Sequence, residues 1–228
     1  MLSRWLDPAI VPPVILRTIL VLLVIALPLR GDPTTPGHHG QDAPHKPVVK
    51  SLAIKIIIPL IDPAKLDTLK GDRAANRRLR LISYHLEVSR RAGNDPGTII
   101  AQAQDALGMA GTHRAEAVRS SLMRSLDILN KLGCLDVAGM GKLKTGNAPT
   151  ITKGPYAGDI ASVDHIVPRS IAEELDEKLF NLEFMPSRMN SKKGNKIGLR
   201  QIQLARKWHA SGLLSAEGLQ AVEKAAKP

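Results

Sequence analysis

The chain has a single cysteine, Cys134, among its 228 residues. One thiol cannot form a disulfide within the chain, and a typical structural zinc site needs at least two cysteines. We therefore expect no internal disulfide and no structural zinc. The cysteine content gives no indication of the redox compartment in which the protein works.

Aromatic residues are also scarce, at 3% of the chain. Proteins that bind single-stranded nucleic acids stack bases on aromatic side chains, so that mode of binding is not expected. Asp and Glu number 21 against 32 Lys and Arg, which gives a formal net charge of +11. This excess suits a polyanion, because cations that neutralise phosphates release counterions. A generally basic soluble protein is the alternative.

A short apolar run lies near the N-terminus, over residues 19–29, behind the positive charges of Arg4 and Arg17. This pattern is typical of a secretory signal peptide, and the run is short for a membrane-spanning helix of about 20 apolar residues. No Ala-x-Ala cleavage site follows. Residues 1–31 are thus a cleaved signal peptide, an uncleaved membrane anchor, or a segment with another role. The first two predict, for a bacterial source, a protein that is exported (periplasmic or secreted) or attached to the membrane.

Residues 32–50 are rich in Pro, Gly and His, which is the composition of a linker. Its histidines, which we take as solvated rather than as ligands for a transition metal, are His38, His39 and His45.

Residues 51–135 are expected to form a mainly helical region that begins with one strand. The apolar, β-branched run from Leu52 to Ile61 predicts that strand, and Pro59 favours an edge position or a strand end. From Arg73 to Arg91 apolar residues recur at helical spacing and arginines occupy the other positions, which predicts an amphipathic helix.

Two more helices follow. Asp95 and Pro96 predict an N-cap and a first helical residue, and Thr112 predicts the cap of a third helix that ends at Gly133. A helix-turn-helix motif is one interpretation, and a plain helical hairpin is the favoured one. The arginine-rich helix either follows a DNA backbone or is a solvated face.

The residues with the clearest chemistry lie between 163 and 196, after a Gly-rich segment (136–162) that predicts turns and short strands. Hydrolysis of a phosphodiester needs a nucleophilic water, a base for its proton and a cation for the developing charge. His165 is a suitable base near neutral pH, and Asp164 and Asn190 offer the oxygen ligands that Mg²⁺ prefers. In a strand, Asp164 and His165 point to opposite sides, so the base stays outside the metal's coordination shell.

Three blocks in this stretch resemble the HNH (His-Me finger, ββα-metal) endonuclease motif. They are DHIVPRS at 164–170, FNLEFM at 180–185 and MNSKKGN at 189–195. The chain is similar to an H-N-N variant of that family, and the resemblance covers roughly residues 150–200. Three blocks in order make it specific, whereas an Asp-His pair alone would not.

The resemblance implies roles for single residues. His165 matches the general base, Asp164 and Asn190 the ligands of Mg²⁺ or Mn²⁺, and Asn181 the asparagine that braces the loop and fixes the base. Phosphate contacts are expected from basic residues of the motif: Arg169, Lys192 and Lys193. Simpler interpretations remain for each, namely a salt-bridged strand end for Asp164 and His165, a turn for Asn181, and solvated helix positions for Asn190 and the two lysines.

The expected fold is α+β, and the resemblance implies its ββα core. A mainly helical region (51–135) precedes a small ββα-metal nuclease core (136–210) and a C-terminal helix (211–228) with Ser215 as N-cap. Within the core, a short acidic helix over 171–179 and a second strand over 182–185 are expected. A metal-binding helix should follow, from Ser187, its N-cap, to Trp208.

The expected function is metal-dependent hydrolysis of DNA, with double-stranded DNA as the expected substrate. One alternative is an exported module with an inactive nuclease fold that still binds nucleic acid. Another is a nuclease toxin effector.

Overall fold

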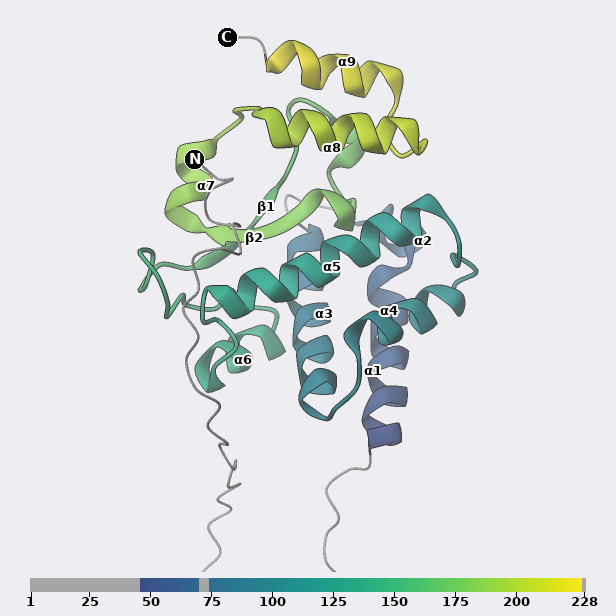
Figure 1. Ribbon diagram of the computed structural model, residues 1–228, viewed down its shortest axis with the longest axis vertical. Helices are drawn as coiled ribbons and strands as arrows, with labels where there is room; N and C mark the ends of the chain where they lie inside the picture. Colours follow the sequence, from purple (N-terminus) through teal and green to yellow (C-terminus); the bar gives the residue numbers. More distant parts are fainter. Residues whose placement is uncertain (1–45, 70–73, 227–228) are drawn as a thin grey trace, which may run out of the picture. The chain divides into compact units, whose positions relative to one another are not determined.

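Figure 1 shows the computed structural model of the chain, which describes residues 46–69 and 74–226. The predicted signal peptide or anchor at 1–31 and most of the predicted linker, with its three histidines, lie outside these residues. Within the described ranges, no helix is long and apolar enough to cross a membrane.

The class is α+β, as predicted, with many helices and a two-stranded antiparallel sheet. The helices of the first half are α1 (Lys46–Ile61), α2 (Pro63–Leu66), α3 (Ala74–Arg91), α4 (Pro96–Asp105), α5 (His113–Lys131) and α6 (Val137–Lys144). The second half consists of β1 (Ala161–His165), the 3-10 turns η3 (Glu173–Leu175) and η4 (Leu179–Asn181), β2 (Leu182–Pro186), α7 (Ser187–Lys193), α8 (Leu199–Ala210) and α9 (Ala216–Ala225).

The strand predicted at residues 52–61 is wrong, because this stretch belongs to helix α1. Ala53, Ile57 and Ile61 are buried at intervals of four residues, and α1 packs against α3 and α4. The helix also includes Lys46 to Lys50, which were assigned to the linker. Burial of this face against two helices outweighs the preference of β-branched residues for strands.

Helices α4 and α5 follow the predicted capping pattern. The side chain of Asp95 accepts a hydrogen bond from the Thr98 amide at 2.6 Å, and that of Thr112 accepts one from the Ala115 amide at 3.1 Å. Helix α5 ends before Gly133, whose φ of +71° suits glycine. The capping residues were therefore correct guides to where these helices begin and end.

Residues 136–162 differ from the predicted turns and strands, because Val137 to Lys144 form α6. The Asp136 side chain caps this helix by accepting a hydrogen bond from the Gly139 amide at 2.7 Å. A Cβ atom at Gly139 would lie 2.0 Å from the Cys134 carbonyl oxygen, so glycine is needed there for close approach. The expected short strands are limited to β1 and an isolated bridge between Thr150 and Ile160.

The sheet joins β1 and β2 as predicted, with Asp164 opposite Glu183 and His165 opposite Leu182. The segment between the strands was expected to hold an acidic helix, and it instead holds the two 3-10 turns. The single helix expected from Ser187 to Trp208 is divided into α7 and α8 at Gly194, which has a φ of +52°. Ser187 is the first helical residue rather than the cap.

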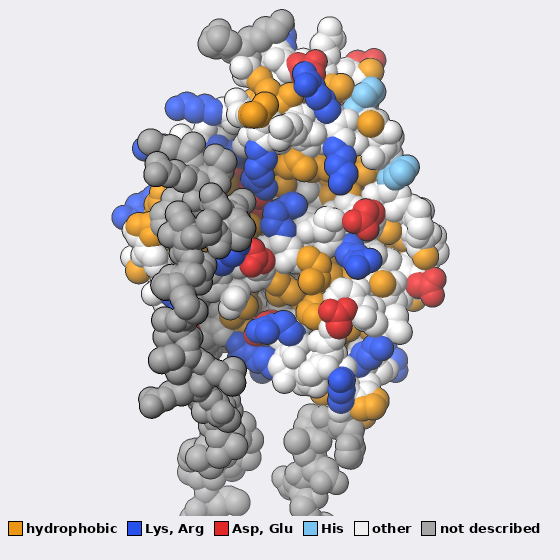
Figure 2. Space-filling model, viewed as in Figure 1, with side chains coloured by type: hydrophobic (Ala, Val, Ile, Leu, Met, Phe, Trp, Pro, Cys, Tyr) orange, Lys and Arg blue, Asp and Glu red, His pale blue; other side chains and the backbone are white. Residues whose placement is uncertain are grey.

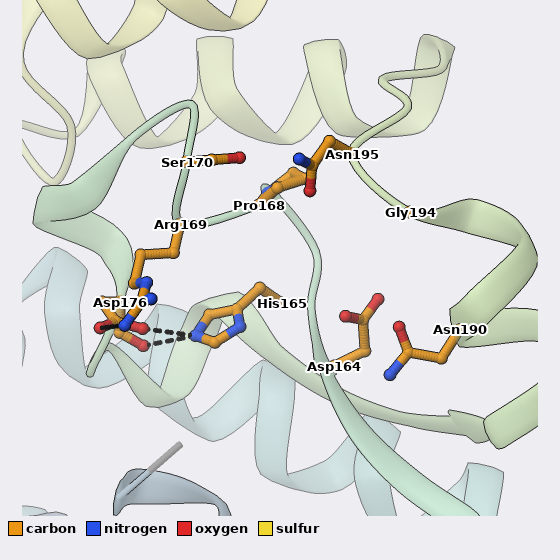
Figure 3. A pocket seen from close by; sticks show the side chains of 9 residues that line it. All are labelled: Asp164, His165, Pro168, Arg169, Ser170, Asp176, Asn190, Gly194 and Asn195. Carbon is orange, nitrogen blue, oxygen red and sulfur yellow. Dashed lines mark hydrogen bonds and ion pairs between the residues drawn. The ribbon is translucent and has the colours of Figure 1, made fainter. Parts of the chain in front are cut away.

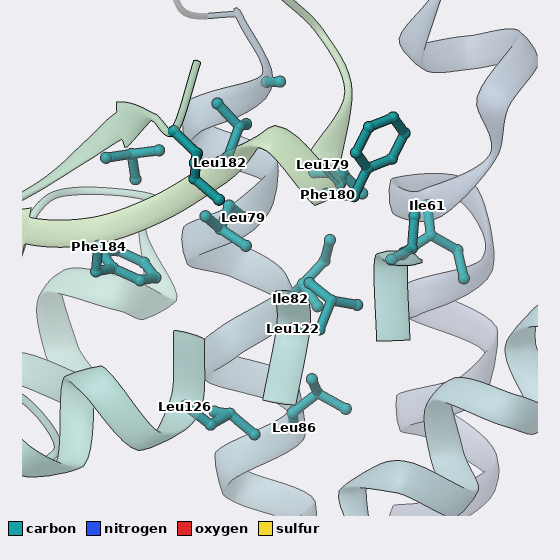
Figure 4. Packing of buried hydrophobic residues seen from close by; sticks show 14 of the residues in the cluster. Ile61, Leu79, Ile82, Leu86, Leu122, Leu126, Leu179, Phe180, Leu182 and Phe184 are labelled. Atoms are coloured by element: carbon teal, nitrogen blue, oxygen red, sulfur yellow. The ribbon is translucent and has the colours of Figure 1, made fainter. Parts of the chain in front are cut away.

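One hydrophobic core connects the helical region to the sheet, and Figure 4 shows part of it. Side chains from α3, α5 and β2 meet there: Leu79, Ile82, Leu86, Leu122, Leu126, Leu182 and Phe184. Buried Ser121 on α5 donates to the carbonyl oxygens of Leu179 and Leu182, both at 3.0 Å. Helix α5 therefore supports the chain that leads into β2. The C-terminal helix α9 packs on α8, and Ser215 caps it as predicted.

Candidate functional site

The sheet ends in the two residues on which the predicted site depends. Asp164 and His165 are the last residues of β1, and successive side chains of a strand point to opposite sides. Figure 3 shows the result: the His165 ring is directed toward Asp176, and the Asp164 carboxylate lies beside Asn190. The alternation expected from the sequence thus separates the imidazole from the carboxylate.

Helix α7 brings Asn190 to the sheet, since it packs against both strands. The amide nitrogen of Asn190 donates to the Ser162 hydroxyl at 3.3 Å. Its amide oxygen is on the side of Asp164 (Figure 3), and it has no hydrogen-bond partner among the described residues. A carboxylate and a neutral amide oxygen therefore face the same space.

A cavity of about 300 Å³ opens at this place. It is lined by residues from β1, from the segment between the strands and from the end of α7: Asp164, His165, Pro168, Arg169, Ser170, Asp176, Asn190, Gly194 and Asn195. Three predicted residues, Asp164, His165 and Asn190, thus meet in one cavity although 25 positions separate Asn190 from His165. Lys192 and Lys193 are not among the lining residues.

The imidazole of His165 is held from one side by Asp176. Nε2 of His165 lies 2.9 Å from the carbonyl oxygen of Asp176 and 2.9 Å from its Oδ1. Both oxygens can only accept, so Nε2 carries the proton, and Nδ1 of a neutral ring is left with a free lone pair. Nδ1 is on the ring edge away from Asp176 (Figure 3), which makes it the nitrogen that can accept a proton.

Asn181 is fully buried and ties the segment after β1 to the turn before β2. Its Oδ1 accepts from the Val167 amide at 2.8 Å, and its Nδ2 donates to the carbonyl oxygens of Val167 and Leu175 at 2.9 and 3.1 Å. The Asn181 carbonyl also accepts from the Ile166 amide at 2.7 Å. Asn181 does not line the cavity, and its contacts fix the chain immediately after His165.

Lys193 lies in an unexpected place. Its side chain is only 8% exposed, and its ammonium group is 2.5 Å from Asp164 Oδ2 and also donates to the His165 carbonyl. Lys193 was predicted as a phosphate contact, with a solvated helix position as the alternative, whereas here its ammonium group is paired with a predicted metal ligand. Lys192, the neighbouring lysine, is exposed.

Both carboxylates of the sheet are paired with cations. Glu183, directly across from Asp164, is buried and receives two hydrogen bonds from Arg200, one of them at 2.7 Å. These bonds raise the pKa of Arg200. Arg124 Nε also lies 3.7 Å from Glu183 Oε2. Like charges opposite one another destabilise a sheet, and these cations offset the repulsion between Asp164 and Glu183.

Asp176 lines the cavity and contacts His165, and the sequence did not single it out. It lies in the acidic stretch 173–177, where nothing in the residue types distinguishes one carboxylate from the next. Its second oxygen, Oδ2, lies 3.6 Å from Nη1 of Arg169, which was predicted as a phosphate contact and lines the cavity. The side chain of Arg169 is 48% exposed, so it can reach a bound molecule as well as Asp176.

The donor atoms fit a hard cation. Asp164 and Asn190 supply oxygen atoms, which suit Mg²⁺ or Mn²⁺ better than a soft metal. The place beside Asp164 already holds a positive charge, the Lys193 ammonium. Within 46–69 and 74–226, no three His, Cys, Asp or Glu side chains form a group that could hold a metal. A metal at Asp164 would therefore have one carboxylate, with Asn190 as the second ligand.

Comparisons with family models, curated proteins and solved structures give no match to this chain. The chemistry of the cavity therefore has to be judged from its own side chains.

Proposed function

We propose that the protein is a metal-dependent endonuclease of the HNH (His-Me finger, ββα-metal) type, which hydrolyses phosphodiester bonds of DNA. The observation that carries the proposal is the meeting of Asp164 and His165, from the end of β1, with Asn190, from the helix α7 that follows β2, in one cavity. The ββα core of that type is β1, β2 and α7 in this chain. Residues 1–31 lead us to propose export or attachment to a membrane.

His165 is the general base. Its Nδ1 accepts a proton from the attacking water, because Nε2 is occupied as a donor to Asp176. Asn181 keeps the base in place through its three side-chain hydrogen bonds to the chain that follows β1. Asp164 and Asn190 would hold Mg²⁺ or Mn²⁺, which neutralises the charge that develops on the phosphate oxygens when it is bound.

DNA is the proposed substrate because of the chain's charge. The net charge of +11 favours a polyanion. On the face shown in Figure 2, Lys and Arg side chains are spread over the surface with acidic ones between them. The proposed phosphate contacts are Arg169, which lines the cavity, and Lys192, which is exposed and close in sequence to Asn190. The scarcity of aromatic residues favours a duplex over stacked single strands.

A plasmid-nicking assay on the full chain tests the proposal. We expect nicking of supercoiled DNA with Mg²⁺, none with EDTA, and none from Asp164→Ala with Mg²⁺, because the metal loses its carboxylate. Glu173→Ala, which removes an exposed acidic side chain of η3, is the matched control and should nick like wild type. Nicking that survives both EDTA and Asp164→Ala would rule out the proposed metal site.

A second candidate is a module that binds DNA without cutting it. The ion pair between Lys193 and Asp164 favours it, because a lysine fixed on a metal ligand opposes metal binding. In the same assay this candidate would give no nicking under any condition, together with a gel shift that weakens as salt rises.

Lys193→Met is expected to bind Mn²⁺ about tenfold more tightly than wild type, since the internal cation no longer competes for Asp164. Isothermal titration calorimetry or electron paramagnetic resonance of free Mn²⁺ measures this without any need for turnover. Lys192→Met removes an adjacent, exposed charge and should leave the affinity unchanged. Equal affinities for the two variants would mean that Lys193 does not compete with the metal.

A further inference from the structure

Asp176 places two oxygen atoms beside Nε2 of His165, although one would be enough to orient the ring. The carbonyl oxygen of Asp176 alone would fix Nε2 as the protonated nitrogen. The side chain of the same residue adds a carboxylate oxygen at the same distance, 2.9 Å. A backbone carbonyl is neutral, whereas a carboxylate brings negative charge against the imidazole.

The carboxylate is itself held in place. Asp176 directly follows η3, and its amide donates to the Glu173 carbonyl at 3.0 Å. Its side chain is only 20% exposed, and Oδ2 is 3.6 Å from Arg169 Nη1 while Oδ1 faces His165. Asp176 is thus the carboxylate of this acidic stretch that is directed at the ring.

We propose that Asp176 is a positioning residue, whose carboxylate orients His165 and stabilises the imidazolium formed during hydrolysis. The proposal rests on the proposed nuclease function, since it assigns a partner to that reaction's base. In other His-Asp pairs, the carboxylate accepts a hydrogen bond from the ring nitrogen that does not take the reacting proton. This bond fixes the ring and favours its charged form.

The step balances in atoms and charge. The oxygen of the water forms a bond to phosphorus while one of its O–H bonds breaks, and that proton goes to Nδ1 of His165. The bond from phosphorus to the leaving sugar oxygen breaks, and that oxygen takes a proton from solvent. The imidazolium then carries both ring protons beside the Asp176 carboxylate, until Nδ1 releases its proton to solvent.

Asp176→Asn tests the carboxylate and keeps the carbonyl oxygen. We expect kcat for plasmid nicking to fall about 10- to 100-fold, the usual cost of losing a residue that orients a functional side chain, with KM little changed. Asp176→Glu should recover part of the loss, because it restores the charge with a longer side chain. Glu173→Gln, an exposed acidic change in the same turn, should leave kcat unchanged.

Proton NMR of the His165 ring gives a readout that needs no cleavage. The Nε2–H resonance, assigned by its absence in His165→Ala, should lie far downfield in wild type and in Glu173→Gln. In Asp176→Asn and Asp176→Ala it should move upfield or be lost to exchange, because no charged acceptor remains beside the ring. Circular dichroism confirms that each variant is folded.

The nicking kinetics and the NMR spectra together distinguish failure of the positioning role from failure of the nuclease function. If wild type cleaves DNA but Asp176→Asn has the same kcat and the same Nε2–H resonance, the positioning role is overturned and the nuclease stands. If wild type does not cleave DNA, the nuclease fails. The resonance then decides whether Asp176 controls the ring: a shift in Asp176→Asn supports the contact, and an unchanged resonance overturns it.

Discussion

His165→Ala is expected to lower the rate of DNA cleavage by about 10²- to 10⁴-fold, the contribution usual for a general base. The alanine cannot take the proton of the attacking water. The Asp164 carboxylate and the Asn190 amide come from other positions, so the metal should still bind. A quantitative nicking assay under single-turnover conditions measures the loss, with calorimetric Mn²⁺ titration and a gel shift beside it.

The matched control is His113→Ala, which removes an exposed histidine at the start of α5, in a different part of the chain. It should cut at the wild-type rate. Loss of cleavage together with loss of Mn²⁺ binding in His165→Ala would point to a ligand role for the ring. Cleavage at the normal rate would show that another group is the base.

The sequence indicates that Asp164, His165 and Asn190 lie close together, because their placement depends on short-range rules. Alternation in a strand separates Asp164 from His165, and an antiparallel hairpin followed by a helix brings Asn190 back to the same place. Asp95, Thr112 and Ser215 marked three helix starts correctly, since a cap satisfies backbone amides within its own turn.

The errors have a different origin. Helix α1 was predicted as a strand because β-branched residues prefer strands. The packing of α3 and α4 against it, which outweighs this preference, is not visible in the local sequence. Pro59 favoured a strand end in the prediction, because a proline lacks the backbone N–H that a helix interior uses. It nevertheless lies inside α1. The Pro59 carbonyl instead accepts from Arg78 at 2.9 Å, a tertiary contact that no local pattern contains.

Two features of the site depend on contacts between distant residues. Asp176 reaches His165 because the chain between the strands folds into two 3-10 turns instead of one acidic helix. Lys193 turns inward because it lies three residues after Asn190, on the face of α7 that packs against the strands. Its ion pair with Asp164 joins residues that are far apart in the sequence. These features need the tertiary structure, and both bear directly on the proposed chemistry.

Asn181→Ala is expected to destabilise the protein by about 3–5 kcal/mol in urea unfolding, among the largest effects of a single substitution. The change removes three hydrogen bonds inside the protein. It leaves the amide of Val167 and the carbonyls of Val167 and Leu175 without their side-chain partner. Asn181→Asp should also be costly, because a carboxylate cannot donate to the two carbonyl oxygens.

Asn147→Ala is the control, since the side chain of Asn147 makes one exposed hydrogen bond, to the Thr145 hydroxyl at 2.9 Å. That variant should unfold within about 0.5 kcal/mol of wild type. If Asn181→Ala unfolds like Asn147→Ala, the buried amide does not hold the segment after β1. Where Asn181→Ala remains folded, its cleavage should also be slower than wild type, because Ile166 and Val167 are the residues that fix His165 at the end of its strand.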